Sequence, residues 1–214
     1  MSYLARRKAL IERIYSDASA CDACANACTL DPPPGQPVPV PHLEHHARQR
    51  RVAMFWLAEA PSTAAIDETG LLCMKCNPET GVTLARELWC ASFAPQDFTY
   101  ADFYPTNALK HKVSPIGRPQ LERCKRFLVR ELEAVRPICI VTHGLNAIKA
   151  LDTISPFPPA RQKLRDVVQK AHHWRDLPVF CLRHCAHSGG GRPKQELLED
   201  WKWTAAEVAK LARP

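Results

Sequence analysis

Four short apolar runs, separated by segments with helical periodicity, constrain the fold of this chain most strongly. The runs are VAMFWLA at 52–58, DFYPTNAL at 102–109, ICIVTH at 138–143 and PVFCL at 178–182. A continuous apolar run of this length, bounded by polar residues, is typical of a strand buried on both faces. Because strands that alternate with helices form a parallel sheet with helices on both faces, the sequence predicts a three-layer α/β/α domain around a mostly parallel four-stranded sheet.

The segments between these runs carry apolar residues at helical spacing, and they predict helices at about 3–16, 80–91, 119–135, 145–151 and 194–211. The most regular of them starts at Pro119, a residue favoured in the first turn of a helix. The stretch DPPPGQPVPVP at 31–41 cannot form a helix or an interior strand, because proline lacks the amide hydrogen. We therefore expect one domain over 1–214, in which 1–51 hold a helix, a cysteine motif and a proline-rich arm.

Composition limits the class of protein. Of 214 residues 46% are hydrophobic and 24% are charged, which is enough apolar material for a normal core. The formal net charge of +7 is compatible with a polyanionic partner. No apolar run approaches the roughly 20 residues that cross a bilayer, and the amino terminus lacks the core of a signal peptide. We expect a soluble, intracellular protein with no membrane partner.

Ten cysteines are many for an intracellular chain of this length, and a metal or iron-sulfur site explains them better than disulfides do. Cys21 and Cys24 form a C-x2-C pair with Cys28 close behind, and Cys73 and Cys76 form a second pair. Each pair can bind one metal centre from a single turn of chain. On spacing alone, zinc and an iron-sulfur cluster both remain open.

Ligand sites of open α/β sheets lie beyond the carboxyl ends of the strands, and polar residues gather there in this chain. The segments in question are AEAPSTAAIDETG at 58–70, PTNALKH at 105–111 and RHCAHSGG at 183–190, with ELEAVRP at 131–137 ending the most regular helix. Their order and spacing over about residues 15–205 resemble the iron-sulfur uracil-DNA glycosylases, the family 4 type and its X-type relatives. That resemblance implies hydrolysis of the N-glycosidic bond of uracil, or another deaminated base, in DNA during base excision repair.

The resemblance also implies roles for the residues at the strand ends. Asn107 would hydrogen-bond O4 and N3–H of uracil, and His184 would donate to O2 as negative charge develops on the leaving base. Glu59 would position the attacking water, while the backbone at Ala60 approaches the base. Met74 stands near the place of the family's stacking phenylalanine and would form a soft apolar lid. These residues are our predicted catalytic and base-binding set.

The loop SGGGRPK at 188–194 follows the motif histidine and matches the family's minor-groove loop. Glycines allow close approach of the backbone, and cations meet phosphate. We therefore expect DNA contacts from this loop, through Ser188, Arg192 and Lys194.

By resemblance, a 4Fe-4S cluster is held by Cys21, Cys24 and Cys124, with His111 in place of the family's fourth cysteine. Imidazole replaces thiolate on iron in Rieske centres. Cys28 is the spare candidate for the fourth ligand, and the alternative for the whole set is a zinc site.

The subtype follows from the segment between His111 and Cys124, KVSPIGRPQLER, which contains no histidine. X-type enzymes carry there the histidine that bonds to the abasic sugar, so we expect a monofunctional enzyme that releases an abasic product. The alternative is a non-catalytic iron-sulfur member of the same fold that binds DNA. In either case we expect a monomer, located in the cytoplasm at the nucleoid, whose partner is DNA.

Overall fold

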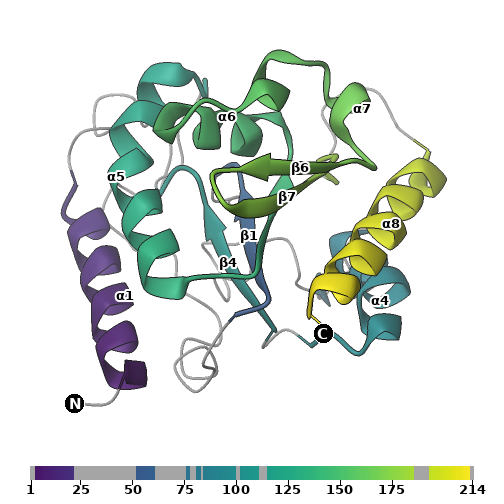
Figure 1. The fold of residues 1–214 in the computed structure, drawn as a ribbon, viewed down its shortest axis with the longest axis horizontal. Helices are drawn as coiled ribbons and strands as arrows, with labels where there is room; N and C mark the ends of the chain where they lie inside the picture. The colour runs from purple at the N-terminus through teal and green to yellow at the C-terminus, as the bar shows by residue number, and fades with distance from the viewer. Residues whose placement is uncertain are drawn as a thin grey trace.

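The computed structural model describes residues 3–21, 52–60, 76–77, 81–82, 84–99, 102–110, 115–185 and 193–212. Elements follow one another in the order α1 (Tyr3–Ser19), β1 (Met54–Ala58), β2 (Cys76–Asn77), β3 (Gly81–Val82), α4 (Leu84–Ser92), η2 (Ala94–Gln96), β4 (Phe103–Asn107), α5 (Arg118–Val135), β5 (Cys139–His143), α6 (Leu145–Ile154), η4 (Pro158–Arg161), α7 (Leu164–Val167), β6 (Ala171–Trp174), β7 (Leu177–Leu182) and α8 (Lys194–Ala212). Figure 1 shows the strands of the main sheet between two groups of helices.

The main sheet has the strand order β4-β1-β5-β7-β6. β1 is parallel to both β4 and β5, and β5 is parallel to β7. The four expected strands correspond to β4, β1, β5 and β7, which confirms the α/β fold with a mostly parallel sheet. β2 and β3 form a separate two-stranded antiparallel pair.

The expected strand count was wrong by one, because β6 adds an antiparallel edge strand to β7. Its sequence, AHHW, contains no apolar run, and only Trp174 is buried. The turn at Arg175 and Asp176 connects the two strands, and Arg175 adopts a left-handed φ of 52°. A short polar strand that is fixed by its hairpin partner leaves no periodic signal in the sequence.

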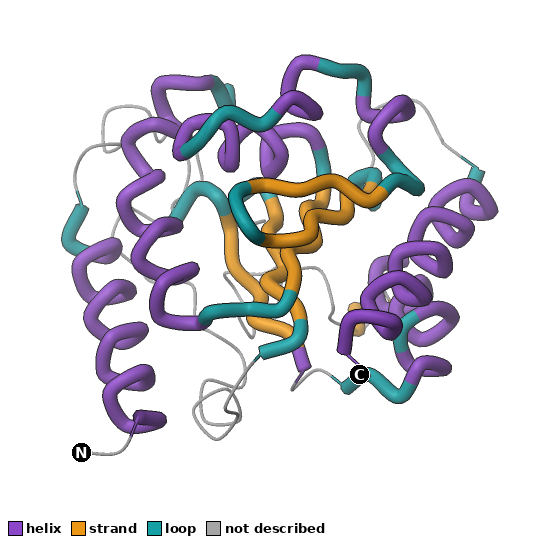
Figure 2. Tube along the Cα trace, in the orientation of Figure 1, coloured by secondary structure: helices purple, strands orange, loops and turns teal. Residues whose placement is uncertain are grey.

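The two faces of the sheet carry different core clusters. On β1, Phe55 and Leu57 pack in the first cluster, with residues of α1, α5 and α6. Met54 and Trp56 point the other way into the second cluster, with residues of α4 and α8. Because successive side chains of a strand face opposite sides, this alternation shows the three layers directly, and Figure 2 shows helices on both sides of the strands.

The bounds of α4 and α6 differ from the expected ones for local reasons. α4 begins at Leu84 instead of residue 80, because Gly81 and Val82 pair in β3. α6 extends to Ile154, where Ser155 takes an extended conformation. Pro105 lies in β4, which is an edge strand, and an edge tolerates a residue without an amide hydrogen.

No helix in the described part of the chain is both long enough and apolar enough to span a membrane.

Candidate functional site

Glu59 and Asn107 lie next to each other at the carboxyl ends of β1 and β4. The two strands are in register so that Ala58 opposes Asn107. Beyond the strands the pairing continues: the Ala108 N–H donates to the Ala58 carbonyl at 2.8 Å, and the Leu109 N–H donates to the Glu59 carbonyl at 3.0 Å. These hydrogen bonds fix the backbone on which both side chains stand.

Gly144 follows β5 directly and connects its end to the end of β7, beside Glu59. Its N–H donates to the Leu182 carbonyl at 2.9 Å, and its φ of 96° lies in a region that residues with a side chain rarely adopt. A Cβ at this position would lie 3.3 Å from His184 Cδ2 and 3.7 Å from Glu59 Oε2. His184 and Glu59 therefore flank Gly144, and a side chain there would crowd His184 but make only an ordinary contact with Glu59.

Asn107 is buried, with 4% of its surface exposed. Its side-chain oxygen, Oδ1, has no hydrogen-bond partner among the residues that the structure describes. A buried carboxamide oxygen without a partner costs about 1–3 kcal/mol of stability, so such groups are rare unless a ligand uses them. The amide of Asn107 is therefore ready to bind a group that donates a hydrogen bond.

A buried ion pair supports the backbone at Asn107. The Lys110 ammonium lies 2.5 Å from Glu131 Oε2, and their side chains are 5% and 0% exposed. Its other two hydrogen bonds go to Thr106 Oγ1 at 2.6 Å and to the Asn107 carbonyl at 2.8 Å. Burial and then the Glu131 charge hold the pKa of Tyr104, another donor to Glu131, well above its usual value. Tyr104 therefore stays a neutral hydrogen-bond donor beside the ion pair of Lys110 and Glu131.

His143, at the end of β5, holds the segment after β7. Its ring stacks on His184 with centroids 4.6 Å apart and 17° between the planes, and its Nε2 accepts a hydrogen bond from the Cys185 N–H at 3.1 Å. Trp56 and Trp201 surround it with ring centroids 5.9 and 5.8 Å away. Burial, reinforced by the His184 charge, lowers the pKa of His143 well below 6.5, so its imidazole is neutral at physiological pH.

A second buried ion pair ties the residue before His184 to the last helix. Arg183 Nη1 donates to Asp200 Oδ2 on α8 at 2.8 Å, and the Asp200 side chain is fully buried. Gln169 donates to the other carboxylate oxygen at 2.9 Å. Burial raises the pKa of Asp200, and the hydrogen bonds from Gln169 and Arg183 oppose that rise.

The predicted site residues thus fall into three groups. Glu59, Asn107 and His184 meet at one edge of the sheet, and Ala60 packs partly buried on the first core cluster. Lys194 begins α8 and forms a surface ion pair with Glu87 of α4. The remaining three, Met74, Ser188 and Arg192, lie outside the described residues.

Half of the predicted cluster ligands lie in the described chain. Cys21, just after α1, and Cys124, on α5, are both buried in the first core cluster. Arg126 donates from Nη2 to Cys21 Sγ at 3.1 Å, and a guanidinium beside sulfur suits a thiolate ligand. Cys24 and His111 lie outside the described residues, and the described ones include no group of three or more metal-binding side chains. Cys21 and Cys124 thus lie in the same core cluster, on the side of the sheet that α1 and α5 cover.

Sequence reasoning missed His143, Lys110 and Glu131. The sequence marks His143 only as the end of a strand, and no local signal marks the pair that Lys110 forms with Glu131 on the following helix. No protein-family model matches this chain, and no curated protein matches it in sequence either.

Proposed function

We propose that this protein is a DNA glycosylase that hydrolyses the N-glycosidic bond of uracil, or another deaminated base, in DNA during base excision repair. The observation that carries the proposal is the buried Asn107 amide, whose Oδ1 has no partner within the described chain. Its oxygen would accept from N3–H of uracil and its NH2 group would donate to O4. Cytosine offers an acceptor at N3 and donors at position 4, so the same amide disfavours it.

In the proposed reaction, His184 and Glu59 assist the cleavage of the N-glycosidic bond. As the bond between C1′ of the sugar and N1 of the base breaks, its electron pair passes to the base, and negative charge collects on O2. An N–H of His184 donates to O2 there. Glu59 accepts a proton from the water whose oxygen bonds to C1′, and its carboxylate favours the positive charge that develops on the sugar. The products are the free base and an abasic site.

His143 acts in this proposal as a positioning residue. Its ring stacks on the His184 ring, and its Nε2 accepts a hydrogen bond from the N–H of the next residue, Cys185. Because burial lowers its pKa, His143 adds no positive charge beside His184. The pair therefore offers one donor with a defined orientation.

Cys21, Cys24, His111 and Cys124 would hold a 4Fe-4S cluster, which would supply a cross-link between the chain after α1 and α5, with no part in the reaction chemistry. The two buried cysteines and the Arg126 guanidinium support this assignment. The DNA partner implies an intracellular location.

The test uses end-labelled DNA with a single uracil, incubated with anaerobically purified protein and then split between alkaline cleavage and a denaturing protein gel. We expect alkali-dependent breaks without a shifted protein band. Asn107→Ala and His184→Ala should abolish the breaks and retain DNA binding, whereas His173→Ala, which removes an exposed imidazole on β6, should act like wild type.

The proposed glycosylase activity is refuted if wild-type protein with intact iron and sulfide binds DNA but excises neither uracil nor other deaminated bases. That result would favour the non-catalytic DNA-binding alternative. A shifted band would refute the hydrolytic route, because it requires a covalent link to the sugar.

A further inference from the structure

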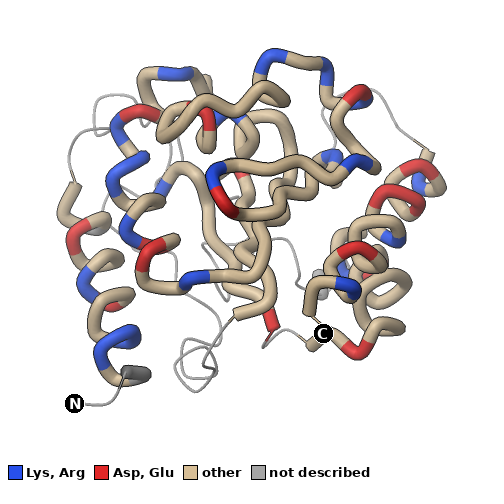
Figure 3. Tube along the Cα trace, in the orientation of Figure 1, with Lys and Arg blue, Asp and Glu red and all other residues tan. Residues whose placement is uncertain are grey.

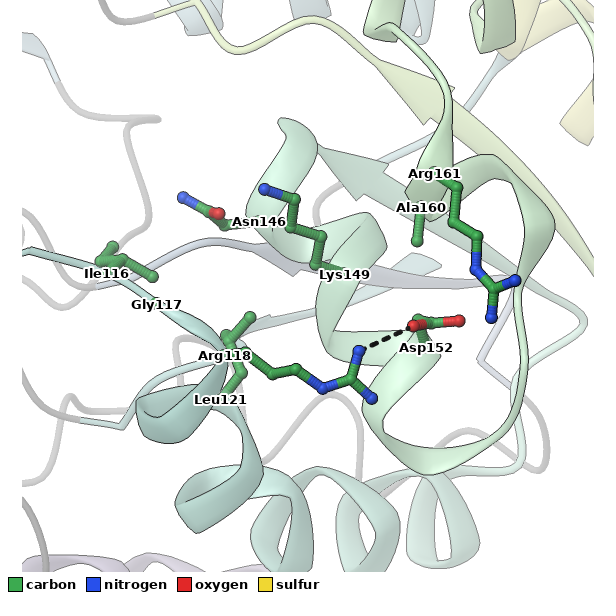
Figure 4. A pocket seen from close by; sticks show the side chains of 9 residues that line it. All are labelled: Ile116, Gly117, Arg118, Leu121, Asn146, Lys149, Asp152, Ala160 and Arg161. Atoms are coloured by element: carbon green, nitrogen blue, oxygen red, sulfur yellow. Dashed lines mark hydrogen bonds and ion pairs between the residues drawn. The ribbon is translucent and has the colours of Figure 1, made fainter.

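A cavity lies on the α5 and α6 side of the sheet, between the first turn of α5, the outer side of α6 and η4, and charged, polar and apolar side chains line it. Its volume is about 240 Å³, below the 300–1,000 Å³ typical of sites for drug-sized ligands. Figure 4 shows Arg118 and Arg161 reaching towards Asp152 from two elements, with Asn146 and Lys149 projecting from α6. The cavity thus suits a small polar group.

The charges that line this cavity are unbalanced. Its one carboxylate, Asp152, is already engaged: Oδ2 lies 3.3 Å from Arg118 Nη1, and Oδ1 accepts from the Phe157 N–H at 3.0 Å. Lys149 and Arg161 form no ion pair with any described residue. The amino-terminal end of α5 adds partial positive charge beside them. An anion would therefore meet two cations that nothing in the described chain neutralises.

The cavity also lies on the edge of the sheet that holds the candidate site. α5 and α6 follow the parallel strands β4 and β5, so both helices begin at the carboxyl edge, and Asn146 is two residues beyond Gly144. The chain from α6 to α7 is rich in cations, and Figure 3 shows several of them near the top of the view. Residues 145–167 contain Lys149, Arg161, Lys163 and Arg165 against Asp152 and Asp166, and Asp166 lies 3.7 Å from Arg165.

We propose that this cavity binds a phosphate group. This phosphate belongs to the DNA backbone, in the strand beside the extruded nucleotide, an assignment that rests on the proposed function. Lys149 and Arg161 would contact the phosphate oxygens, Asn146 would donate a further hydrogen bond, and Asp152 would hold Arg118 in place. Such a contact fixes the strand without reading its sequence.

The experiment compares Lys149→Gln and Arg161→Gln with Lys202→Gln, which removes an equally exposed cation from α8 on the other side of the sheet. Binding of uracil-free duplex DNA is followed by fluorescence anisotropy over a series of salt concentrations. The two cavity variants should bind several-fold more weakly, and the double variant should have a log K against log salt slope shallower by about 0.9, the value of one phosphate contact. Titration with inorganic phosphate, by calorimetry, forms the second arm.

Loss of both DNA affinity and salt slope in the cavity variants but not in Lys202→Gln supports the backbone phosphate. Unchanged DNA binding, with phosphate uptake that the cavity variants lose, supports a phosphate site but overturns the DNA source. If the variants change neither readout, the cavity is not a phosphate site. Uracil-free DNA keeps these outcomes independent of excision, so a failed glycosylase test does not decide them.

Discussion

Replacing Lys110 with methionine tests whether the buried ion pair supports the candidate site. Methionine keeps the length of the side chain but leaves the Glu131 carboxylate, 0% exposed, without its cation. Removing one partner of a buried pair costs about 3–5 kcal/mol, a large part of the roughly 5–15 kcal/mol that stabilises a typical domain. The Asn107 carbonyl also loses its donor, so excision should fall with stability.

The assay is urea unfolding at pH 7 on a double-mutant cycle of Lys110→Met, Glu131→Gln and the combined variant. A neutral glutamine still accepts from Thr106, so the double variant should lose much less stability than the sum of the single variants. Arg130→Met is the matched control on the same helix. It breaks a pair with Asp17 whose side chains are 36% and 48% exposed, and should cost only about 0.2–1 kcal/mol.

The reasoning is refuted if Lys110→Met unfolds with a free energy within about 1 kcal/mol of the Arg130→Met control. It is also refuted if the cycle is additive, because the two side chains would then not stabilise each other.

Three further predictions concern His143, Gly144 and the cysteines. Below pH 6.5 the unfolded chain protonates His143 and the folded chain does not, so the free energy of unfolding of the wild type should fall by up to about 1.4 kcal/mol per pH unit. His143→Gln should remove that slope in urea titrations from pH 7.5 to 5, and equal slopes in the two proteins would contradict the prediction. Gly144→Ala should cost about 1–3 kcal/mol in thermal unfolding and lower excision more than DNA binding, because its Cβ meets His184; wild-type excision would count against this. Cys124→Ala should lower the iron content and the melting temperature of the protein, whereas substitution of the exposed Cys90 by alanine should change neither. Equal iron content in the two variants would show that Cys124 is not a ligand.

The parallel sheet could be predicted because its strands are apolar on both faces. Phe55 and Trp56 of β1 lie in the core clusters on opposite faces of the sheet. Only a strand covered on both faces needs large apolar residues at successive positions. β6 could not be predicted, since His172 and His173 leave it polar and only the hairpin with β7 makes it a strand. Pairing at an edge depends on a partner, which a local pattern does not contain.

The sequence predicts the residues at the strand ends of the candidate site, but not the buried residues that hold them in place. Strand ends drew attention to Asn107 and His184, and the fold brings both to one edge. Nothing local relates Lys110 to Glu131, which stands 21 positions further along the chain. His143 likewise looks like an ordinary strand residue until its ring is seen against His184. Polar contacts across elements depend on packing angles that periodicity does not specify.

The central place of β1 has a consequence for how the chain folds. Met54 pairs with Phe103 on one side and with Cys139 on the other, so this apolar strand meets both neighbours only after long loops close. Loop closure must precede the contacts that reward it, and folds dominated by such pairings form slowly. During that delay β1 exposes two hydrophobic faces and two unpaired edges. Refolding yield should therefore fall as protein concentration rises, with β1 as the segment through which chains associate.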